Sequence, residues 1–520
     1  MAGISHGQGR GAHAHGLWLA GSACWVLLLT GCLGSNSSAG GSAGSVVRPS
    51  ESPGGTVVQT AIPRATCRTS DAPEKGLQGQ VALADRLAGF TGYHCNMDLV
   101  GQYEGEGASW QHTSYKDCSY YGQAYALIAV APKEPKRPTL MKPGAVVIDV
   151  SDSSKPRDAG RLTSVSMLDP WESLKVNTAR GLLAAVNGTS SNNGGPEFDV
   201  YDIKGDCTKP RLLYSGKLSD TTVIGHEGEW APDGLTYYGG DLTQGQYYAI
   251  DVSNPAAPKF ITKFSPPVGV HGLSVSPDGT RGYVTLSGSG RNEGNNTNGF
   301  AIYDFSPIHN RAADPTPKLI SATYWNDGST AQHTIPVKIK GQDYLIAVDE
   351  LGSDGTSSVA NRVVTCGSGR LAFGIPRIFD VSNPSKPVLL SKLTLDINQP
   401  ENCQTASMDT VGLALFGYDS HYCQVDNPAD AKMLACGYFN SGLRLFDITN
   451  PSHVREIAYF NPAMKPGQKG GSTFNVSGNC FGADWTSSQP RFVLEKNEIW
   501  FTSQCAGFQV VRYDPAVVPR

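Results

Sequence analysis

IFDVSNP, at residues 378–384, is the clearest copy of a pattern that recurs along this chain. In each copy a hydrophobic strand runs into Asp, a hydrophobic residue, Ser or Thr, and Asn or Asp, and often ends in Pro. Close copies are VIDVSD (147–152), AIDVSNP (249–255) and LFDITNP (445–451). Weaker copies are VYDIKGD (200–206), IYDFSP (302–307) and VVRYDP (510–515), the last with Arg512 in place of the Asp. The chain therefore contains seven related units.

The spacing of these copies indicates the architecture. Neighbouring copies are separated by between 49 residues (Asp202 to Asp251) and 76 residues (Asp304 to Asp380), and periods of this size are typical of propellers or solenoids. Each unit has room for four short strands joined by turns such as Pro-Asp-Gly at 232–234, whose residues suit tight turns. The sequence therefore predicts an all-β fold, a seven-bladed β-propeller with four-stranded blades.

The two ends of the repeat region indicate how the ring closes. The last unit is expected to have three strands and no fourth, near 481–485, 498–503 and 508–513. The segment MDLVGQY (97–103) looks like an outer strand without a blade of its own. We predict that this N-terminal strand completes the seventh blade and closes the ring, because closure covers edges that would otherwise be exposed. The propeller then spans 97–520, and an N-terminal extension spans 61–96.

Composition agrees with such a fold and excludes several classes of protein. Gly (60) and Pro (33) are abundant among the 520 residues, as expected for a chain rich in turns, and 39% of the residues are hydrophobic, which argues against disorder. Lys plus Arg (42) nearly balances Asp plus Glu (46), giving a net charge of −4. A nucleic-acid partner is not expected, because it would need a basic surface.

The N-terminal region predicts export and a membrane anchor. The hydrophobic stretch at 17–29 is short for a bilayer span and typical of a signal-peptide core. It runs into Leu29-Thr30-Gly31-Cys32, which resembles the lipobox of bacterial lipoproteins. The resemblance implies a signal peptide over 1–31 and a lipid on Cys32; an ordinary secretory signal cut nearby is the alternative. Residues 32–60 would form a flexible tether, placing the protein on the extracytoplasmic face of the cell membrane or outer membrane.

The cysteines agree with export. Besides Cys24 in the signal and Cys32, the other ten of the 12 cysteines are an even number, which in an exported chain suggests disulfides. None of these pairs has CxxC spacing, so a thiolate zinc site is not expected. The sequence leaves the pairing open. Cys423 with Cys436 and Cys480 with Cys505 are plausible pairs, because each pair flanks a predicted hairpin.

The Asp-Val-Ser-Asn-Pro turns and the strands around them resemble the LVIVD-repeat family of bacterial propeller proteins, over roughly residues 95–514. The resemblance implies the fold and says little about function, because propellers support binding, scaffolding and several kinds of catalysis. The repeated Asp is expected to be structural, since a short acceptor before a turn binds backbone N–H groups. Insertions such as 287–298 are candidates for individual function.

The histidines supply the chemical signal. Four of them open predicted innermost strands: His112, His226, His271 and His333. Equivalent positions on four blades face one axis, so their imidazoles can converge on a transition metal ion. Glu227 and Glu229 beside His226, and the pair Asp349-Glu350, are candidates to orient these imidazoles. The alternative is structural, with each His ordering a turn against the neighbouring blade. His421 is expected to lie in a loop, with no role assigned.

Two functions are compatible with these observations. The first is a membrane-anchored binding or interaction module at the cell envelope, with a protein, a glycan or a small molecule as partner. The alternative is a metal-dependent, His-ligated propeller enzyme of redox or lyase type, with its site at the mouth of the central channel. A serine hydrolase is not supported, because no Gly-x-Ser-x-Gly elbow lies between a strand and a helix.

Overall fold

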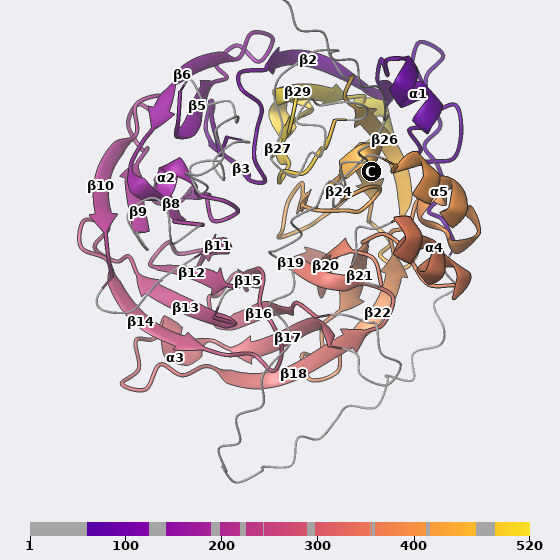
Figure 1. Ribbon diagram of the computed structural model, residues 1–520. Helices are drawn as coiled ribbons and strands as arrows, with labels where there is room; N and C mark the ends of the chain where they lie inside the picture. The colour runs from indigo at the N-terminus through magenta and orange to yellow at the C-terminus, as the bar shows by residue number, and fades with distance from the viewer. Residues whose placement is uncertain are drawn as a thin grey trace, which may run out of the picture. The chain divides into compact units, whose positions relative to one another are not determined.

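The computed structural model describes residues 60–123, 142–188, 198–218, 225–242, 244–288, 297–353, 355, 359–411, 416–463 and 484–520. Within these residues the strands form seven sheets arranged as blades around a ring (Figure 1). The fold is thus the predicted all-β, seven-bladed propeller with four-stranded blades. The predicted signal peptide, Cys32 and the tether lie outside the described residues. No helix within the described ranges is long and apolar enough to cross a membrane.

Blades one to four follow the chain, each from its innermost to its outermost strand. Blade one contains β3 (His112–Tyr115), β4 (Cys118–Tyr121), β5 (Ala145–Asp149) and β6 (Arg157–Leu162). Blade two contains β7 (Lys175–Asn177), β8 (Leu182–Val186), β9 (Phe198–Asp202) and β10 (Arg211–Gly216). Blade three contains β11 (Glu227–Trp230), β12 (Thr236–Asp241), β13 (Gln246–Asp251) and β14 (Lys259–Phe264). Blade four contains β15 (Leu273–Val275), β16 (Arg281–Leu286), β17 (Asn298–Asp304) and β18 (Lys318–Trp325).

Two of the last three blades include a strand from the N-terminal part of the chain. Blade five contains β19 (Ser329–Ile339), β20 (Gln342–Leu351), β21 (Pro376–Asp380) and β22 (Val388–Lys392). Blade six contains β23 (Cys423–Val425), β24 (Met433–Tyr438), β25 (Gly442–Asp447), β26 (Arg455–Asn461) and a fifth strand, β1 (Tyr93–Cys95). Blade seven contains β27 (Arg491–Val493), β28 (Glu498–Ser503), β29 (Gly507–Tyr513) and β2 (Met97–Tyr103).

The helices of the described residues are short. They are α1 (Leu83–Ala88), α2 (Val165–Leu168), α3 (Ser306–His309), α4 (Val359–Gly367) and α5 (Cys403–Asp409). Helix α4 is inserted between β20 and β21, and α5 precedes blade six. Both helices lie together at the edge of the ring, next to the outer strands of blades five and six (Figure 1). These insertions enlarge the part of the ring where the repeat spacing is longest.

Burial explains why the middle strands are so apolar. Every residue of β12 is buried, whereas β10 at an outer edge has only exposed and half-buried residues. Neighbouring blades pack face to face: Tyr238 of blade three lies in one hydrophobic cluster with Val284 and Phe305 of blade four. A strand covered on both faces has no solvent-exposed side. Its sequence is therefore close to continuously hydrophobic and does not alternate between polar and apolar residues.

The repeated Asp residues stabilise the outer turns. In blade after blade the Asp Oδ1 atom accepts a hydrogen bond from the backbone N–H two residues later, at 2.8–2.9 Å for Asp149, Asp202, Asp251, Asp304 and Asp380 and at 3.0 Å for Asp447. This bond is an Asx turn, which sets the chain direction without help from other blades. These contacts are those of the structural role expected from the sequence.

The ring closes as predicted. Strand β2 pairs with β29, with Met97 opposite Tyr513 and Tyr103 opposite Phe508. The inner strand predicted near 481–485 lies mostly outside the described residues; the innermost strand described in blade seven is β27, and neither Asp484 nor Trp485 is in a strand. The Asp484 carboxylate accepts hydrogen bonds from the Ser503 hydroxyl and from the backbone at the turn between β28 and β29. That residue is therefore held in a loop rather than in a strand.

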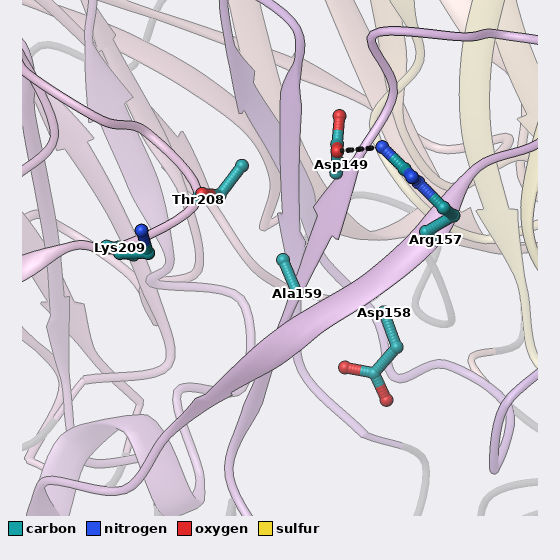
Figure 2. A pocket seen from close by; sticks show the side chains of 6 residues that line it. All are labelled: Asp149, Arg157, Asp158, Ala159, Thr208 and Lys209. Atoms are coloured by element: carbon teal, nitrogen blue, oxygen red, sulfur yellow. Dashed lines mark hydrogen bonds and ion pairs between the residues drawn. The ribbon is translucent and has the colours of Figure 1, made fainter.

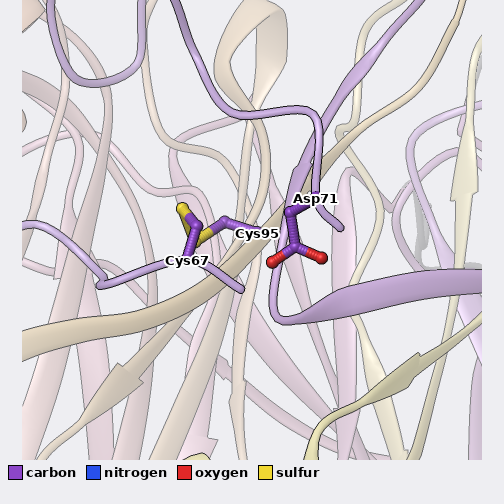
Figure 3. Close-up of side chains that lie close together, drawn as sticks. All are labelled: Cys67, Asp71 and Cys95. Carbon is purple, nitrogen blue, oxygen red and sulfur yellow. A yellow bond between two sulfur atoms is a disulfide. The ribbon is translucent and has the colours of Figure 1, made fainter. Parts of the chain in front are cut away.

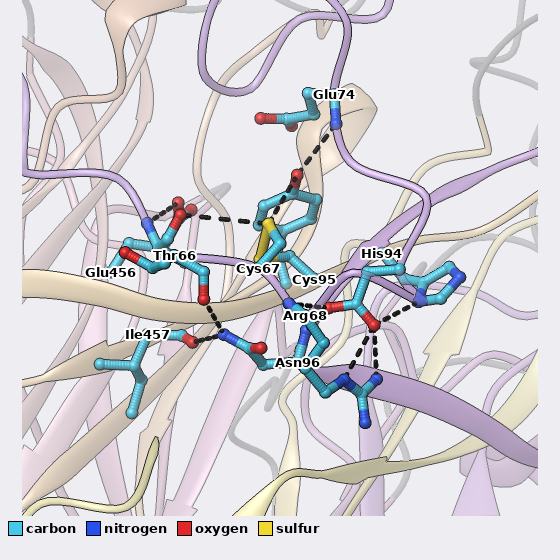
Figure 4. Close-up of a disulfide and its surroundings, with 12 residues drawn as sticks. Thr66, Cys67, Arg68, Glu74, His94, Cys95, Asn96, Glu456 and Ile457 are labelled. Carbon is cyan, nitrogen blue, oxygen red and sulfur yellow. Dashed lines mark hydrogen bonds and ion pairs between the residues drawn. A yellow bond between two sulfur atoms is a disulfide. The ribbon is translucent and has the colours of Figure 1, made fainter. Parts of the chain in front are cut away.

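The N-terminal extension is fastened to blade six. Strand β1 pairs with β26, and a disulfide joins Cys67 to Cys95 close to Asp71 (Figure 3). Asn96 donates its side-chain amide to the carbonyl oxygens of Thr66 and Ile457 around this disulfide, both at 2.9 Å (Figure 4). The extension thus covers the outer edge of β26, which would otherwise be an unpaired edge.

Four disulfides join described cysteines: Cys67–Cys95, Cys118–Cys207, Cys366–Cys403 and Cys423–Cys436. The second links blades one and two, and the third links α4 to α5. The fourth joins adjacent strands of blade six and is one of the two pairs that the sequence analysis names. Cys480, from the other named pair with Cys505, lies outside the described residues.

Candidate metal centre

Chain segments that enter the innermost strands meet at the centre of the ring (Figure 1). In five blades the residue at this entrance is Gln111, Glu172, His226, His271 or His421, and in blade five we give the same name to Gln332, which lies within β19. Backbone hydrogen bonds join neighbouring entrances: the Glu172 N–H donates to the His226 carbonyl at 3.1 Å, and the Gly272 N–H donates to the Gln332 carbonyl at 2.7 Å. Residues far apart in sequence are therefore brought together here by the closure of the ring.

Four of these residues, together with Glu350 of β20, form what we call the channel cluster: Glu172, His226, His271, Glu350 and His421. Glu172 Oε2 lies 3.6 Å from His226 Nε2 and 3.8 Å from His271 Nδ1. Glu172 Oε1 lies 3.5 Å from His421 Nε2. Glu350 completes the cluster, with Oε1 at 3.3 Å from His421 Nε2 and Oε2 at 3.5 Å from His271 Nε2.

These separations are too long for good hydrogen bonds, which place N and O about 2.7–3.2 Å apart. They match the spacing of ligands around a shared ion. Two donor atoms that are each about 2.1 Å from one metal lie about 3.0 Å apart at a right angle and about 3.4 Å apart at the tetrahedral angle. Imidazole and carboxylate without thiolate is a donor set that suits divalent Fe, Mn or Zn. The cluster thus has both the spacing and the chemistry of a metal site.

The cluster is buried except along one edge. The side chains of Glu172, His271 and His421 are at most 2% exposed, whereas those of His226 and Glu350 are 18% and 13% exposed. Gly272 makes the close packing possible, because a Cβ atom at this position would lie 2.0 Å from Oε2 of Glu227. An ion held by the cluster could therefore be reached by solvent or substrate on the side of His226 and Glu350.

The pKa values of the three imidazoles are shifted in different directions. Burial, with a contribution from His271, lowers the pKa of His226 to about 4. For His421 burial also disfavours the charged form, but Glu172 and Glu350 outweigh it and raise the pKa to about 9. Burial likewise acts against a charged His271, yet Glu227 and Glu350 raise its pKa well above the usual value. Burial would raise the pKa of both Glu172 and Glu350, and their imidazole neighbours lower it instead.

Neighbouring groups orient the imidazoles. The His421 Nδ1 atom lies 2.6 Å from the carbonyl oxygen of Ser487, so Nδ1–H donates there and Nε2 faces Glu172 and Glu350. Gln332 contacts the same Nε2 atom through its side-chain nitrogen at 2.9 Å. Backbone carbonyls and carboxylates that hold the second ring nitrogen of a ligating His are a regular feature of metal sites. The Tyr422 hydroxyl donates to Glu172 Oε2 at 3.3 Å.

Of the four histidines predicted as ligands, the structure brings together His226 and His271, whose ring centroids are 4.4 Å apart. It places the other two elsewhere. His112 contacts the Gln489 carbonyl and the Ser119 hydroxyl, and His333 accepts a hydrogen bond from the Cys423 N–H. Each follows the entrance residue of its blade by one position, and successive side chains along a strand face opposite sides. Both therefore lie outside the channel cluster, and their contacts are of the kind expected for the structural alternative.

The carboxylates predicted to orient the imidazoles lie in different surroundings. Glu227 Oε2 lies 3.4 Å from His271 Nδ1, next to the channel cluster, and burial raises the Glu227 pKa. Glu229 faces Lys175, with 3.7 Å between its Oε2 atom and the Lys175 Nζ atom, and its side chain is 29% exposed. Glu350, paired with Asp349 in the sequence analysis, belongs to the cluster itself.

Sequence reasoning missed Glu172 and His421 as members of the cluster. A signal for both existed: each stands at the entrance position of its blade, as His226 and His271 do. His421 was assigned to a loop, and it does precede β23. Aligning the blades on the entrance residue, instead of on every His near a strand, would have selected Glu172 and His421 and set aside His112 and His333.

A groove on the outside of blades one and two lies apart from the channel cluster. Its lining includes Asp149, Arg157 and Lys209 (Figure 2). The Asp149 carboxylate pairs with the Arg157 guanidinium at 2.7 Å. Asp149 is one of the repeated turn residues, so this groove is made from the structural parts of the blade.

One protein-family model matches a short part of this chain. The LVIVD repeat matches residues 377–394, which span most of β21 and all of β22. No curated protein matches the chain. Among solved structures, a periplasmic gluconolactonase of Pseudomonas aeruginosa is 13% identical, with a TM-score of 0.48, and the match covers 73% of this chain and 90% of that one. A putative 6-phosphogluconolactonase of Bacteroides uniformis is 12% identical, with a TM-score of 0.45. The match covers 76% of this chain and 95% of that one.

A third structure, Saccharomyces cerevisiae Sqt1, is 9% identical, with a TM-score of 0.41, and the match covers 68% of this chain and 74% of that one. Likenesses at these levels say nothing about the chemistry of this chain. The chain therefore carries an LVIVD repeat within a seven-bladed β-propeller.

Proposed function

We propose that this protein is a metal-dependent propeller enzyme of redox or lyase type, with a divalent transition metal held by the channel cluster. The observation that carries the proposal is the convergence of three imidazoles and two carboxylates from five blades, at N–O distances of 3.3–3.8 Å. The half-exposed edge at His226 and Glu350 favours a catalytic role, because structural metal sites are closed by protein ligands whereas catalytic sites keep an open position.

The metal content of the purified chain tests this proposal. We expect a near-stoichiometric transition metal in protein prepared without chelator and without a His tag, measured by mass spectrometry. His271→Ala should lower the metal content, because it removes a ligand at the middle of the cluster. His333→Ala and the surface variant His453→Ala are matched controls that should retain it.

The binding or interaction module predicts another outcome. In that case the wild-type chain would contain no metal, and His271→Ala would change stability alone. Such a result would overturn the enzyme proposal and direct the search to a protein, glycan or small-molecule partner.

We further propose that the protein acts outside the cytoplasm, anchored to a membrane through a lipid on Cys32. The lipobox-like sequence supports the anchor, and the four disulfides support an oxidising compartment. Cys32→Ala should move the protein from the membrane fraction to the soluble fraction of the cell. Unchanged membrane association of this variant would exclude the anchor.

A further inference from the structure

We infer that the channel cluster binds two divalent metal ions bridged by the carboxylate of Glu172, an inference that rests on the proposed function. The two oxygens of Glu172 face different partners. Oε2 faces His226 Nε2 (3.6 Å) and His271 Nδ1 (3.8 Å), and Oε1 faces His421 Nε2 (3.5 Å). The cluster therefore divides at Glu172 into two sets of ligands.

The first set, site one, comprises Glu172, His226 and His271; the second set, site two, comprises Glu172, Glu350 and His421. In each set, one ligand atom from every residue lies within 4.8 Å of those from the other two. A carboxylate that gives one oxygen to each of two ions holds them at the spacing of two-metal centres, about 3.5–4 Å. Glu172 is placed to do this, because its side chain is 2% exposed and borders both sets.

His271 argues against one ion that uses every ligand. Its Nδ1 atom faces Glu172, and its Nε2 atom lies 3.5 Å from Glu350 Oε2. A single ring cannot give both nitrogens to one ion. With Nδ1 ligating site one, Nε2–H is free to donate to Glu350, which ties the two sites together through a second carboxylate.

The remaining charges favour a bound cation. Glu227 adds a third buried carboxylate, 3.4 Å from His271 Nδ1, and Lys175 Nζ lies 4.0 Å from it. Among the described residues, the pairing of Lys175 with Glu227 leaves the carboxylates of Glu172 and Glu350 without a basic side chain of Lys or Arg, and uncompensated buried charge is costly. Mn²⁺, Fe²⁺ and Zn²⁺ all accept this mixture of imidazole and carboxylate.

Each site has one competing hydrogen bond. The Trp171 indole N–H donates to His226 Nε2 at 3.2 Å and so occupies the lone pair that site one needs. Trp171 also has a backbone φ of 46°, a conformation that is unusual for a bulky residue. The Gln332 side-chain nitrogen lies 2.9 Å from the His421 Nε2 atom of site two. An ion in either site must therefore displace one such contact.

Titration of the detergent-solubilised full-length chain with Mn²⁺ tests the inference. Equilibrium dialysis with mass spectrometry should find two Mn²⁺ per chain, and electron paramagnetic resonance of the loaded protein should show magnetic coupling. His226→Ala should keep one uncoupled ion in site two, and His421→Ala should keep one in site one. Trp171→Phe should strengthen binding at site one, because Phe has no N–H to compete for His226. His453→Ala, an exposed histidine, controls for surface binding.

The outcomes separate this inference from the proposed function. One uncoupled ion in the wild type, lost completely in both His226→Ala and His421→Ala, would show a single-ion centre. The proposed function would then stand and the two-ion inference would be wrong. No bound Mn²⁺, Fe²⁺ or Zn²⁺ in the wild type would overturn both.

Discussion

The outer turns and the central entrances of the blades occur once per repeat, but they use their polar residues differently. At the outer turns the same residue type recurs, and Asp380 bonds the backbone only two residues away, at 2.8 Å. At the entrances the residue type varies between Glu, His and Gln, and Glu172 meets His421 from a blade on another part of the ring. A residue that repeats because every blade needs it is structural. A residue that varies at an equivalent position is free to contribute to a site that exists once.

The largest effect is expected on metal binding, when a carboxylate of the channel cluster is removed instead of a carboxylate of an outer turn. Glu350→Ala should weaken metal binding at least about 100-fold, since even residues that only support metal ligands contribute 10- to 100-fold. Asp380→Ala should leave metal content unchanged, because the Asp380 carboxylate bonds within its own turn. Metal analysis after gel filtration, on variants with unchanged circular dichroism, measures both. Equal metal loss in the two variants would remove the distinction between the two regions.

The next largest effect is expected on the free energy of unfolding, and two arginines of blade six should differ in it. Arg444 is buried and pairs with Glu74 of the N-terminal extension and with Glu456, while Arg455 at the outer turn is 58% exposed and pairs with Asp447. Arg444→Ala should cost about 3–5 kcal/mol, because it leaves buried carboxylates without a partner. Arg455→Ala should cost less than about 1 kcal/mol. Urea unfolding followed by tryptophan fluorescence measures the difference, and similar costs would contradict it.

Acid should weaken another interior ion pair. Burial would raise the pKa of Asp327, but Arg377 and Lys392 outweigh it and lower the value to about 2. A lowered pKa stabilises the fold above the unfolded-state pKa of about 3.9, and that contribution, about 2 kcal/mol, is lost as pH falls from about 4 to about 2. Thermal unfolding should therefore show Asp327→Asn less stable than wild type at pH 6 and nearly equal to it at pH 2. A difference that does not change with pH would exclude this origin.

The smallest effect belongs to the repeated Asp itself. Asp380→Ala removes one hydrogen bond to the Ser382 N–H and should cost about 1 kcal/mol, as the loss of a helix cap does. Asp251→Ala should cost somewhat more, because Asp251 also pairs with Arg311 at 3.1 Å. The two midpoints of chemical unfolding give the comparison. A cost of several kcal/mol for Asp380→Ala would mean that the turn is coupled to distant parts of the ring.

The sequence by itself determined the features that depend on neighbours along the chain. Seven copies of the Asp turn established the number of blades, because each turn is built from its own residues. The lone strand at 97–103 revealed how the ring closes, since blade seven lacked one strand. The entry of His226 and His271 into the channel followed from their place just before innermost strands.

Only the tertiary structure decided which residues meet at the centre. A displacement of one residue along a strand moves a side chain to the opposite face. This separates Gln332, which contacts His421, from His333, which contacts the Cys423 N–H of blade six. Glu172 and Glu350 join the site because ring closure brings blades two and five to one axis. No local pattern records that distance, so the channel cluster can be recognised only when all the blades are in place.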